Sequence, residues 1–250
     1  MSLLSVARDL QRRKARERSG RFVAEGVRTV EELLKSGLHI DGILASESVG
    51  AHSRADGLLD DARGAGVPIL VVTEADFDSA AGTDSPQGVL AVAAAPVWEL
   101  ARLPETGLRL LVLDGVQDPG NVGTILRTAA AFSVSVTVAL PGTVDLWNAK
   151  VVRSAMGSHF VHPTLFCTTD ALAPFLADRG IPLWGADAAG TPVSELSVPA
   201  QWALVVGNEG AGLSPATQSL VAGTVALPIS AAVESLNVAV ATGILLFALR

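Results

Sequence analysis

The sequence predicts an α/β protein with two domains, of which the second has a mainly parallel sheet. From residue 108 onward, short apolar strands alternate with helical segments, which is typical of a parallel sheet covered on both faces. A weaker alternation of the same kind occupies the first 95 residues. Between them, residues 96–107 contain two prolines and a glycine, which favour a linker. We therefore expect domains over residues 1–95 and 108–250.

The elements of the first domain follow from hydrophobic spacing. Apolar residues at helical spacing indicate helices, and short apolar runs indicate buried strands. The helices are expected over Leu3–Glu17, Val27–Lys35 and Arg54–Arg63, and the strands over Ile40–Ala45, Pro68–Val72 and Gly88–Ala93.

The second domain repeats this pattern with stronger strands. In parallel sheets, ligands bind at the loops that leave the carboxyl ends of the strands, so functional residues are expected there. The strands are expected over Leu108–Leu113, Val134–Leu140, Pro182–Ala186 and Ala203–Val206, and the helices over Pro119–Phe132, Asn148–Met156 and Thr169–Arg179.

Composition favours a well-packed protein without a membrane segment. Hydrophobic residues make up 49% of the 250 residues and charged residues 17%, which suits a sizeable core. The longest nearly apolar stretch, Leu236–Leu249, is too short to span a bilayer. It predicts a helix buried within the domain or against a second subunit. The first ten residues lack the apolar run of a secretory signal, so we expect a cytoplasmic protein.

Basic residues are concentrated near the N-terminus. The net charge of −7 argues against a nucleic-acid-binding protein, but the distribution of charge matters more than its sum. This cluster is either a solvated helix face or a surface for RNA phosphates, and charge alone leaves both open. The candidates for RNA contacts are Arg8, Arg12, Arg13, Lys14, Arg16, Arg18 and Arg21.

No metal site or disulfide is expected. Cys167 is the only cysteine, which excludes a disulfide within the chain and a multi-thiolate metal site. It lies in a strand-like run, where a small buried side chain is a stronger interpretation than a nucleophile. His159 and His162 lack further ligands nearby, which argues against a metal site there.

The first candidate loop follows the first strand of the second domain. Asp118 is suited to cap the helix after it, and Pro119 suits the first helical position. Gly120, Gly123 and Arg127 share one face of that helix. Glycine inside a helix costs about 1 kcal/mol relative to alanine, so this face indicates close approach of another backbone or a ligand. Tight packing on the sheet, with Arg127 as an ordinary surface charge, explains the glycines equally well.

A second candidate loop, residues 207–212, has the sequence G-N-E-G-A-G between a strand and a helix that begins near Ser214. Its glycines let backbone groups contact a flat ligand closely. Their spacing differs from the dinucleotide-binding fingerprint, and Glu209 would repel a pyrophosphate. A cationic ligand such as a sulfonium is more compatible with this loop.

A third candidate loop, residues 227–238, runs into the last helix. Ser235 and Asn237 are polar residues beside an otherwise apolar segment. One interpretation makes Ser235 the N-cap of the helix and Asn237 a hydrogen-bonding residue of its first turn. The other places both side chains in a site that the helix covers.

Together the loops resemble the three sequence motifs of the SpoU (TrmH-like) RNA ribose methyltransferases. The motifs are N-x-G-x-I-x-R at Asn121–Arg127, G-N-E-G-x-G at Gly207–Gly212 and S-L-N-V at Ser235–Val238, in the family's order. Residues 21–26 (R-F-V-A-E-G) and 86–91 (P-Q-G-V-L-A) also resemble the ribosomal-protein-like substrate-binding domain that many members carry. The resemblance covers nearly the whole chain.

This resemblance implies an S-adenosylmethionine-dependent RNA 2′-O-methyltransferase with a trefoil-knotted catalytic domain. It also implies a homodimer with the site near the subunit interface. By position along the chain, the resemblance implies the catalytic residues Arg127, Asn121, Glu209, Ser235 and Asn237. It implies the cofactor-binding residues Gly207, Leu227, Ile229 and Leu236 in the same way.

The expected chemistry is in-line methyl transfer to a ribose 2′-hydroxyl. Because a hydroxyl is a poor nucleophile, the negative charge that develops on it needs a nearby cation or base. Arginine stays protonated, with a pKa above about 12, so we expect Arg127 to stabilise that charge, and a role as base stays open. The other polar residues would orient Arg127, the ribose and its phosphate.

Two alternatives belong to other functional classes. A non-catalytic RNA-binding protein with a methyltransferase fold is disfavoured by the intact set of polar motif residues. A nucleotide-dependent oxidoreductase is disfavoured by the glycine spacing. Among RNA targets, the N-terminal domain resembles the branch that acts on ribosomal RNA, which favours large-subunit ribosomal RNA over transfer RNA. An antibiotic-resistance enzyme that methylates the ribosome also fits.

Overall fold

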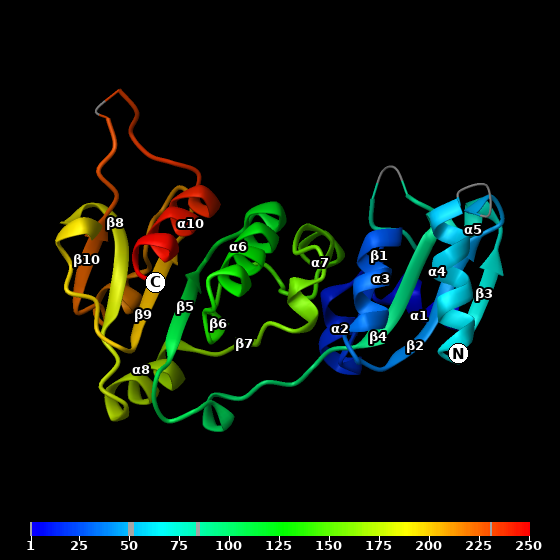
Figure 1. Ribbon diagram of the computed structural model, residues 1–250, viewed down its shortest axis with the longest axis horizontal. Coiled ribbons are helices and arrows are strands. Elements are labelled where there is room, and N and C mark those ends of the chain that lie inside the picture. The colour runs from blue at the N-terminus through cyan, green and yellow to red at the C-terminus, as the bar shows by residue number, and fades with distance from the viewer. Residues whose placement is uncertain (1, 50–52, 84–85, 231) are drawn as a thin grey trace. The chain divides into compact units, whose positions relative to one another are not determined.

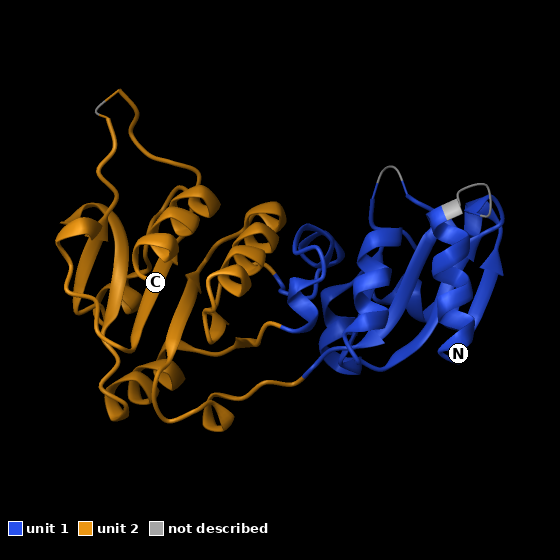
Figure 2. Ribbon diagram, viewed as in Figure 1, with its two compact units in different colours: residues 1–96, 145–161 blue, residues 97–144, 162–250 orange. Residues whose placement is uncertain are grey.

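The structure is a computed structural model that describes residues 2–49, 53–83, 86–230 and 232–250. It divides into two compact units (Figures 1 and 2). Unit 1 comprises residues 1–96 and 145–161, and unit 2 comprises residues 97–144 and 162–250. Residues 145–161 therefore belong to unit 1 by their contacts. The boundaries expected from the sequence assign each domain one continuous stretch of chain. They therefore did not include residues 145–161, which we call the returning segment, in the first domain.

Unit 1 contains a four-stranded mixed sheet. The strand order is β1-β4-β2-β3, with β4 antiparallel to both neighbours and β2 parallel to β3. The strands are β1 (Arg21–Glu25), β2 (Ile40–Ser46), β3 (Ile69–Val72) and β4 (Val89–Ala94), and the helices are α1 (Leu3–Asp9), α2 (Arg13–Ser19), α3 (Val27–Lys35), α4 (Ser53–Gly64), α5 (Glu74–Asp78) and α7 (Ala149–Ser154).

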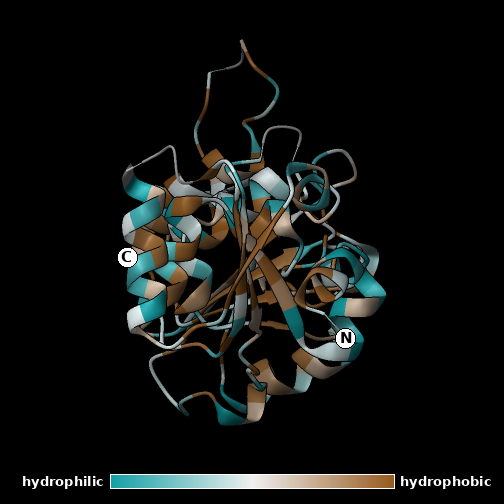
Figure 3. Ribbon diagram, turned by 90° about the vertical axis from the view of Figure 1, so that its right-hand side faces the viewer, coloured by the Kyte–Doolittle hydropathy of each residue, from teal (hydrophilic) through white to brown (hydrophobic). Residues whose placement is uncertain are grey.

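Apolar side chains of unit 1 are divided between the two faces of this sheet. Successive residues of a strand point to opposite faces. Phe22 and Ala24 lie in a core with side chains of α3 and α4, whereas Val23 lies in a second core with side chains of α1 and α5. Figure 3 shows the strands mostly in the hydrophobic colour, while the helices carry both colours. The sheet is therefore covered on both faces.

The returning segment 145–161 completes the first of these cores. It supplies α7 and a 3₁₀ turn over Ser158–Phe160. The ring centroid of Phe22 lies 4.5 Å from that of Trp147 and 5.7 Å from that of Phe160. Val152 and Phe160 are both buried in this core. Unit 1 thus depends on side chains that come from far along the chain.

Unit 2 contains a six-stranded sheet in which all pairings are parallel, as the sequence predicts. The strand order is β10-β8-β9-β5-β6-β7. Apolar residues of α8 share a core with one face of the sheet, and α6 and α10 pack against each other. The strands are β5 (Arg109–Asp114), β6 (Val136–Ala139), β7 (Thr164–Phe166), β8 (Leu183–Pro192), β9 (Trp202–Gly207) and β10 (Gly223–Ala226), and the α-helices are α6 (Pro119–Ala131), α8 (Thr169–Asp178), α9 (Pro215–Gln218) and α10 (Val238–Ala248).

The N-terminal region differs from the expected single helix over Leu3–Glu17. It forms α1 and α2, separated by a turn. The guanidinium of Arg16 donates to the carbonyl oxygens of Leu10, at 2.6 Å, and Gln11, at 3.0 Å. These bonds satisfy carbonyls at the end of α1 that a continuing helix would otherwise satisfy. Strands β1 and β10 were also not expected.

The remaining expectations concern membranes, metals and the cysteine. Within the described residues, no helix has the length and apolar character needed to cross a membrane. The same residues include no cluster of three or more histidine, cysteine or acidic side chains that could hold a metal ion. Cys167 is partly buried, and burial raises the pKa of its thiol to about 11. His162 is buried beside Thr137, at 2.8 Å between Nε2 and Oγ1, and burial lowers its pKa to about 4.

Candidate active site

The loops after β5 and β9 lie at one edge of the unit 2 sheet. The two strands are parallel neighbours, so their carboxyl ends point to the same edge. The side-chain amide of Asn208 donates to the carbonyl oxygen of Gly115 at 2.9 Å. The backbone amide of Ser214 donates to the buried carboxylate of Asp114 at 2.7 Å. These bonds hold the first and second candidate loops together.

Three of the predicted catalytic residues form one hydrogen-bonded chain. The side-chain amide of Asn121 donates to Oε1 of Glu209 at 3.1 Å, and that of Asn237 donates to Oδ1 of Asn121 at 3.0 Å. One residue comes from each of the three candidate loops. We call Asn121, Glu209 and Asn237 the amide–carboxylate cluster.

Helix N-termini fix two members of this cluster. Asp118 is the N-cap of α6, and its Oδ1 accepts from the backbone amide of Asn121 at 2.7 Å, as expected. Asn237 is itself the N-cap of α10, and its Oδ1 accepts from the amides of Ala239 and Val240. The interpretation that made Ser235 the N-cap is therefore wrong. Asn237 uses its oxygen for the helix and its nitrogen for Asn121.

Glu209 is held as a carboxylate. Burial opposes its ionisation, but hydrogen bonds from the Asn121 side chain and from backbone amides, including that of Gln117, outweigh this effect. The net result is a pKa below the ordinary value for glutamate. Glu209 is therefore ionised at neutral pH and can serve as a fixed acceptor beside Asn121.

A cavity of about 430 Å³ opens beside the cluster. The catalytic candidates Glu209, Ser235 and Asn237 line it, and Ser235 is exposed. Asp187 is a lining residue that the sequence did not single out. The cavity is also lined by all four predicted cofactor-binding residues, which are Gly207, Leu227, Ile229 and Leu236.

The shape of this cavity depends on Gly207. A Cβ atom at this position would lie 2.4 Å from the carbonyl carbon and oxygen of Gly212 and 2.7 Å from the backbone nitrogen of Leu213. The loop closes there through paired backbone bonds between Asn208 and Gly212, at 2.9 and 3.0 Å. Only glycine lets the two backbone segments approach this closely.

The lining suits a cationic methionine-derived cofactor. Asp187 and Glu209 are the charged members among the described lining residues, and no arginine or lysine is among them. Leucine and isoleucine side chains offer apolar contacts for a flat ring, while loop glycines expose backbone amides and carbonyls. S-adenosylmethionine carries a sulfonium, which two carboxylates favour electrostatically. The residues present therefore fit this cofactor.

Arg127 stands apart from the cluster and the cavity. It lies on α6 with an exposed side chain and does not line the cavity. Its guanidinium makes no ion pair or hydrogen bond with another described residue. The structure therefore brings together Asn121, Glu209 and Asn237, but it does not bring Arg127 to them within one chain.

Asn208 is a residue of this site that the sequence analysis did not select. Besides contacting Gly115, it accepts through Oδ1 from the backbone amides of Gly210, at 3.0 Å, and Ala211, at 2.9 Å. An asparagine that precedes a tight turn after a strand often caps that turn with its own side chain. This signal was present in the motif, between Gly207 and Glu209.

The N-terminal arginines are mostly paired within unit 1. Arg16 is only 7% exposed and contacts Asp145 at 2.6 Å, so it has a structural role, which corrects the expectation that it contacts RNA. Lys14 is exposed. The other pairs are Arg8 with Asp76, Arg13 with Glu17, both Arg12 and Arg18 with Asp9, and Arg21 with Asp41.

Comparison with known families matches both parts of the chain. Residues 109–247 match the SpoU rRNA methylase family, and residues 6–91 match the MRM3-like substrate-binding domain. The first match covers more than half of the chain, and it includes the residues of the amide–carboxylate cluster.

Relatives of known name agree with this assignment. The chain is 36% identical over 242 residues to the 23S rRNA (guanosine(2553)-2′-O)-methyltransferase RlmP of Bacillus subtilis, covering 96% of this chain and 93% of that protein. It is also 36% identical over 199 residues to the 23S rRNA (guanosine-2′-O-)-methyltransferase RlmB of Xanthomonas campestris, covering 75% and 79%.

Solved structures of the same kind contain the cofactor. The SpoU methyltransferase AviRb from Streptomyces viridochromogenes in complex with AdoMet superposes with a TM-score of 0.88 at 26% identity, covering 100% of this chain and 97% of that one. An AdoMet-bound rRNA methyltransferase from Sinorhizobium meliloti gives 0.84 at 28% identity, with 100% and 96% coverage. The chain belongs to the SpoU rRNA methylase family and is an S-adenosylmethionine-dependent RNA 2′-O-methyltransferase.

Proposed function

We propose that the protein methylates a ribose 2′-hydroxyl of large-subunit ribosomal RNA. The observation that carries the proposal is the acid-lined cavity of unit 2, which lies beside the amide–carboxylate cluster. The names of the RlmP and RlmB relatives, both 23S rRNA methyltransferases, support the choice of RNA. Transfer RNA is the alternative substrate that an experiment must exclude.

The residues of this site would divide the work of catalysis. S-adenosylmethionine, when bound, supplies an electrophilic methyl group. Gly207, Leu227, Ile229 and Leu236 would hold the cofactor in the cavity that they line. The amide–carboxylate cluster would orient the ribose and its phosphate, since positioning of the reacting atoms lowers much of the barrier.

Arg127 would stabilise the negative charge that develops on the attacking oxygen. A guanidinium remains protonated at neutral pH, which suits electrostatic stabilisation better than proton removal. Its lack of an ion pair with described residues leaves this charge available. Because it lies outside the cavity of its own chain, its role is tied to the assembly of the protein.

A homodimer would form across an apolar groove of about 450 Å³ between α6 and α10. Val240, Ile244 and Phe247 line it and are 52%, 44% and 51% exposed. Exposed apolar patches of this kind mark interaction surfaces. Arg127 is one helical turn from Thr124, another lining residue, so it would lie at the edge of this interface. Ile244→Asp should convert a dimer to a monomer in light-scattering measurements, and an unchanged mass would contradict this assignment.

Two further features follow from the family and are proposed on that basis. The last helix, α10, would pass through the preceding loop to form a trefoil knot, which an experimental structure with bound cofactor would test by its chain path. The protein would act in the cytoplasm, where cell fractionation should recover it with ribosomal particles.

The decisive experiment maps 2′-O-methyl groups in RNA from cells with and without the gene. One site in large-subunit ribosomal RNA should disappear with the gene and return when the gene is restored. The purified protein with S-adenosylmethionine should methylate the same nucleotide in unmodified ribosomal RNA. Loss of a site in transfer RNA, with ribosomal RNA unchanged, would overturn the choice of substrate.

A further inference from the structure

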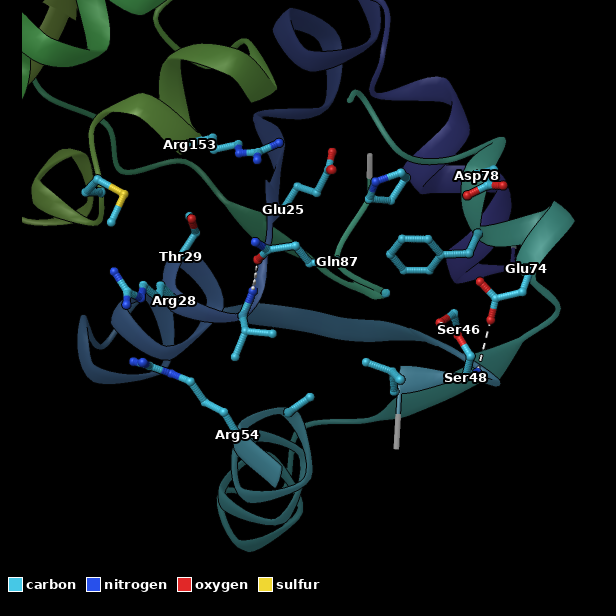
Figure 4. A pocket seen from close by; sticks show the side chains of 18 residues that line it. Glu25, Arg28, Thr29, Ser46, Ser48, Arg54, Glu74, Asp78, Gln87 and Arg153 are labelled. Carbon is cyan, nitrogen blue, oxygen red and sulfur yellow. Dashed lines mark hydrogen bonds between the residues drawn. The ribbon is translucent and has the colours of Figure 1, made fainter. Parts of the chain in front are cut away.

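Unit 1 contains a second cavity, of about 670 Å³, well away in the chain from the methyl-transfer motifs. Its walls come from the start of α3, the end of β2, helices α4 and α5, the turn before β4, and the returning segment 145–161. Arg28, Arg54 and Arg153 line it (Figure 4). We call it the arginine cavity.

Charge is distributed unevenly around the arginine cavity. Figure 4 shows Arg28, Arg54 and Arg153 on one side, and Glu74 and Asp78 on the other. Glu25 also lines the cavity, and its carboxylate accepts from the backbone amide of Gly82 at 2.8 Å. Glu31 binds Arg54 through two hydrogen bonds, at 2.8 and 2.6 Å. Within the described ranges, no carboxylate pairs with Arg28 or Arg153. These two guanidiniums therefore line the cavity without forming an ion pair, unlike the paired arginines of the N-terminal segment.

The walls of this cavity are tightly built. The side-chain carbonyl of Gln87 accepts from the backbone amide of Val27 at 3.2 Å, which joins the turn before β4 to the start of α3. A Cβ atom at Gly26 would lie 2.9 Å from that carbonyl oxygen, and one at Gly88 would lie 2.7 Å from Oγ of Ser46. Both glycines have positive φ values, +97° and +71°. The close approach leaves a preformed space rather than a loose surface.

The position of Arg153 depends on an unusual turn after α7. Met156, which is 40% exposed and lines the cavity, has a φ of +52°. A non-glycine residue in this region is strained, and such residues are concentrated at functional sites. A Cβ atom at Gly157 would lie 2.5 Å from Cβ of Glu32 on α3. The backbone at Gly157 therefore lies close against α3, and Arg153 and Arg28 line the same cavity.

The two sides of the cavity match different parts of a nucleotide. Guanidinium groups bind phosphate through paired hydrogen bonds. Glu74, whose carboxylate accepts from the amide of Ser48 at 3.0 Å, together with Asp78 offers acceptors for the amino groups of a base. An acidic peptide would satisfy the arginines but would bring its carboxylates towards Glu74 and Asp78. Unpaired bases in loops are the usual targets of specific RNA recognition.

We propose that the arginine cavity binds an unpaired nucleotide of the RNA substrate, with its phosphate on Arg28 and Arg153. The proposal rests on the proposed function, because it takes RNA as the substrate. It assigns part of the RNA-binding surface to Arg153, which lies outside the matched substrate-binding domain of residues 6–91. It also places the main phosphate contacts away from the N-terminal arginines.

The test compares charge-matched double variants of the full chain. Arg28→Ala/Arg153→Ala should bind deproteinised large-subunit ribosomal RNA at least about tenfold more weakly, and the slope of log affinity against log salt should fall by roughly 1–2. Lys35→Ala/Arg63→Ala removes the same charge from exposed side chains outside the cavity and should leave both quantities nearly unchanged. Equal losses in the two variants, or no loss in the first, would overturn the proposal.

Three additional measurements keep the result unambiguous. Arg28→Gln/Arg153→Gln keeps polar side chains of similar length and should show the same loss, which guards against misfolding of the alanine variant. Arg12→Ala/Arg13→Ala should lose less affinity than the cavity variant, and a larger loss would move the phosphates to the N-terminal segment and overturn the assignment. Cofactor affinity should be equal in all variants. If the wild type binds this RNA through the cavity but methylates no ribosomal RNA, the proposed function fails and the cavity assignment stands.

Discussion

The two units build their functional surfaces in different ways. In unit 2, the amide–carboxylate cluster comes from loops at the same edge of a parallel sheet, so it follows from the order of strands and helices along the chain. In unit 1, both the aromatic core and the arginine cavity need the returning segment 145–161. From this difference we expect unit 1 to depend for its stability on residues of segment 145–161. We expect truncation of polar side chains in the unit 2 site to affect the reaction more than the fold.

Phe160→Ala should have the largest effect on stability. Phe160 is 3% exposed in the unit 1 core, and truncation of a buried phenylalanine costs about 3–5 kcal/mol. Phe175→Ala in α8, where the side chain is 6% exposed, is the matched change in the unit 2 core. Hydrogen exchange should show loss of protection in β1 and α3 for the first variant only. Loss confined to unit 2 in both variants would break the comparison.

Arg127→Ala should abolish most of the reaction while the protein stays folded. Loss of one preorganised charge-stabilising group typically lowers kcat about 10²–10³-fold. Methyl transfer to ribosomal RNA and cofactor binding should be measured together, and only the former should fall. Arg102→Ala, which removes an exposed arginine of the same unit, serves as the control. Retained turnover in Arg127→Ala would contradict the assigned role.

Arg16→Ala should destabilise unit 1 by about 3 kcal/mol, because it leaves the partly buried Asp145 without its partner. Arg13→Ala removes an exposed pair with Glu17 and should change the free energy of unfolding by less than about 1 kcal/mol. Urea denaturation of both variants tests this difference. Equal effects would show that Arg16 does not hold the N-terminal segment to segment 145–161.

Asn121→Ala should have the smallest effect of these changes, which is a shift in the pH dependence of cofactor affinity. The hydrogen bond from Asn121 helps to lower the pKa of Glu209, so its loss should raise that pKa towards the ordinary value. Because a depressed pKa favours the ionised form, the contribution of Glu209 is present at neutral pH and is lost as pH falls through its folded-state pKa. Cofactor affinity should therefore begin to fall at a higher pH in the variant than in the wild type when it is measured across a range of acidic pH. Gln218→Ala, which changes an exposed side chain on α9, should leave this pH dependence of cofactor affinity unchanged.

The sequence could indicate which loops of unit 2 meet, because this information is local, whereas the catalytic roles of their residues stay a prediction. Asn121, Glu209 and Asn237 each lie in a recognisable loop, and the ends of parallel strands bring such loops together. The cap at Asp118 and the glycine at position 207 were also predictable from local backbone requirements.

The contacts of unit 1 were not predictable in the same way. The charge cluster near the N-terminus suggested free arginines, but Asp76 and Asp145, which pair with Arg8 and Arg16, lie far along the chain. The packing of Trp147 on Phe22 is likewise non-local. The helical pattern of the sequence continues through residues 10–12, yet the chain turns there. The buried guanidinium of Arg16 donates hydrogen bonds to the carbonyl oxygens of Leu10 and Gln11 at this turn. Such tertiary contacts leave no periodic pattern in the sequence.

The return of residues 145–161 also constrains how this protein can be divided. The chain passes between the units near residues 96, 145 and 161 rather than once. A fragment that ends at residue 96 would lack Trp147 and Phe160, and the complementary fragment would carry those rings without the core that buries them. Exchange of one unit between relatives would need coordinated changes at separate places in the gene. The two units are therefore expected to be inherited together, although each contains its own sheet.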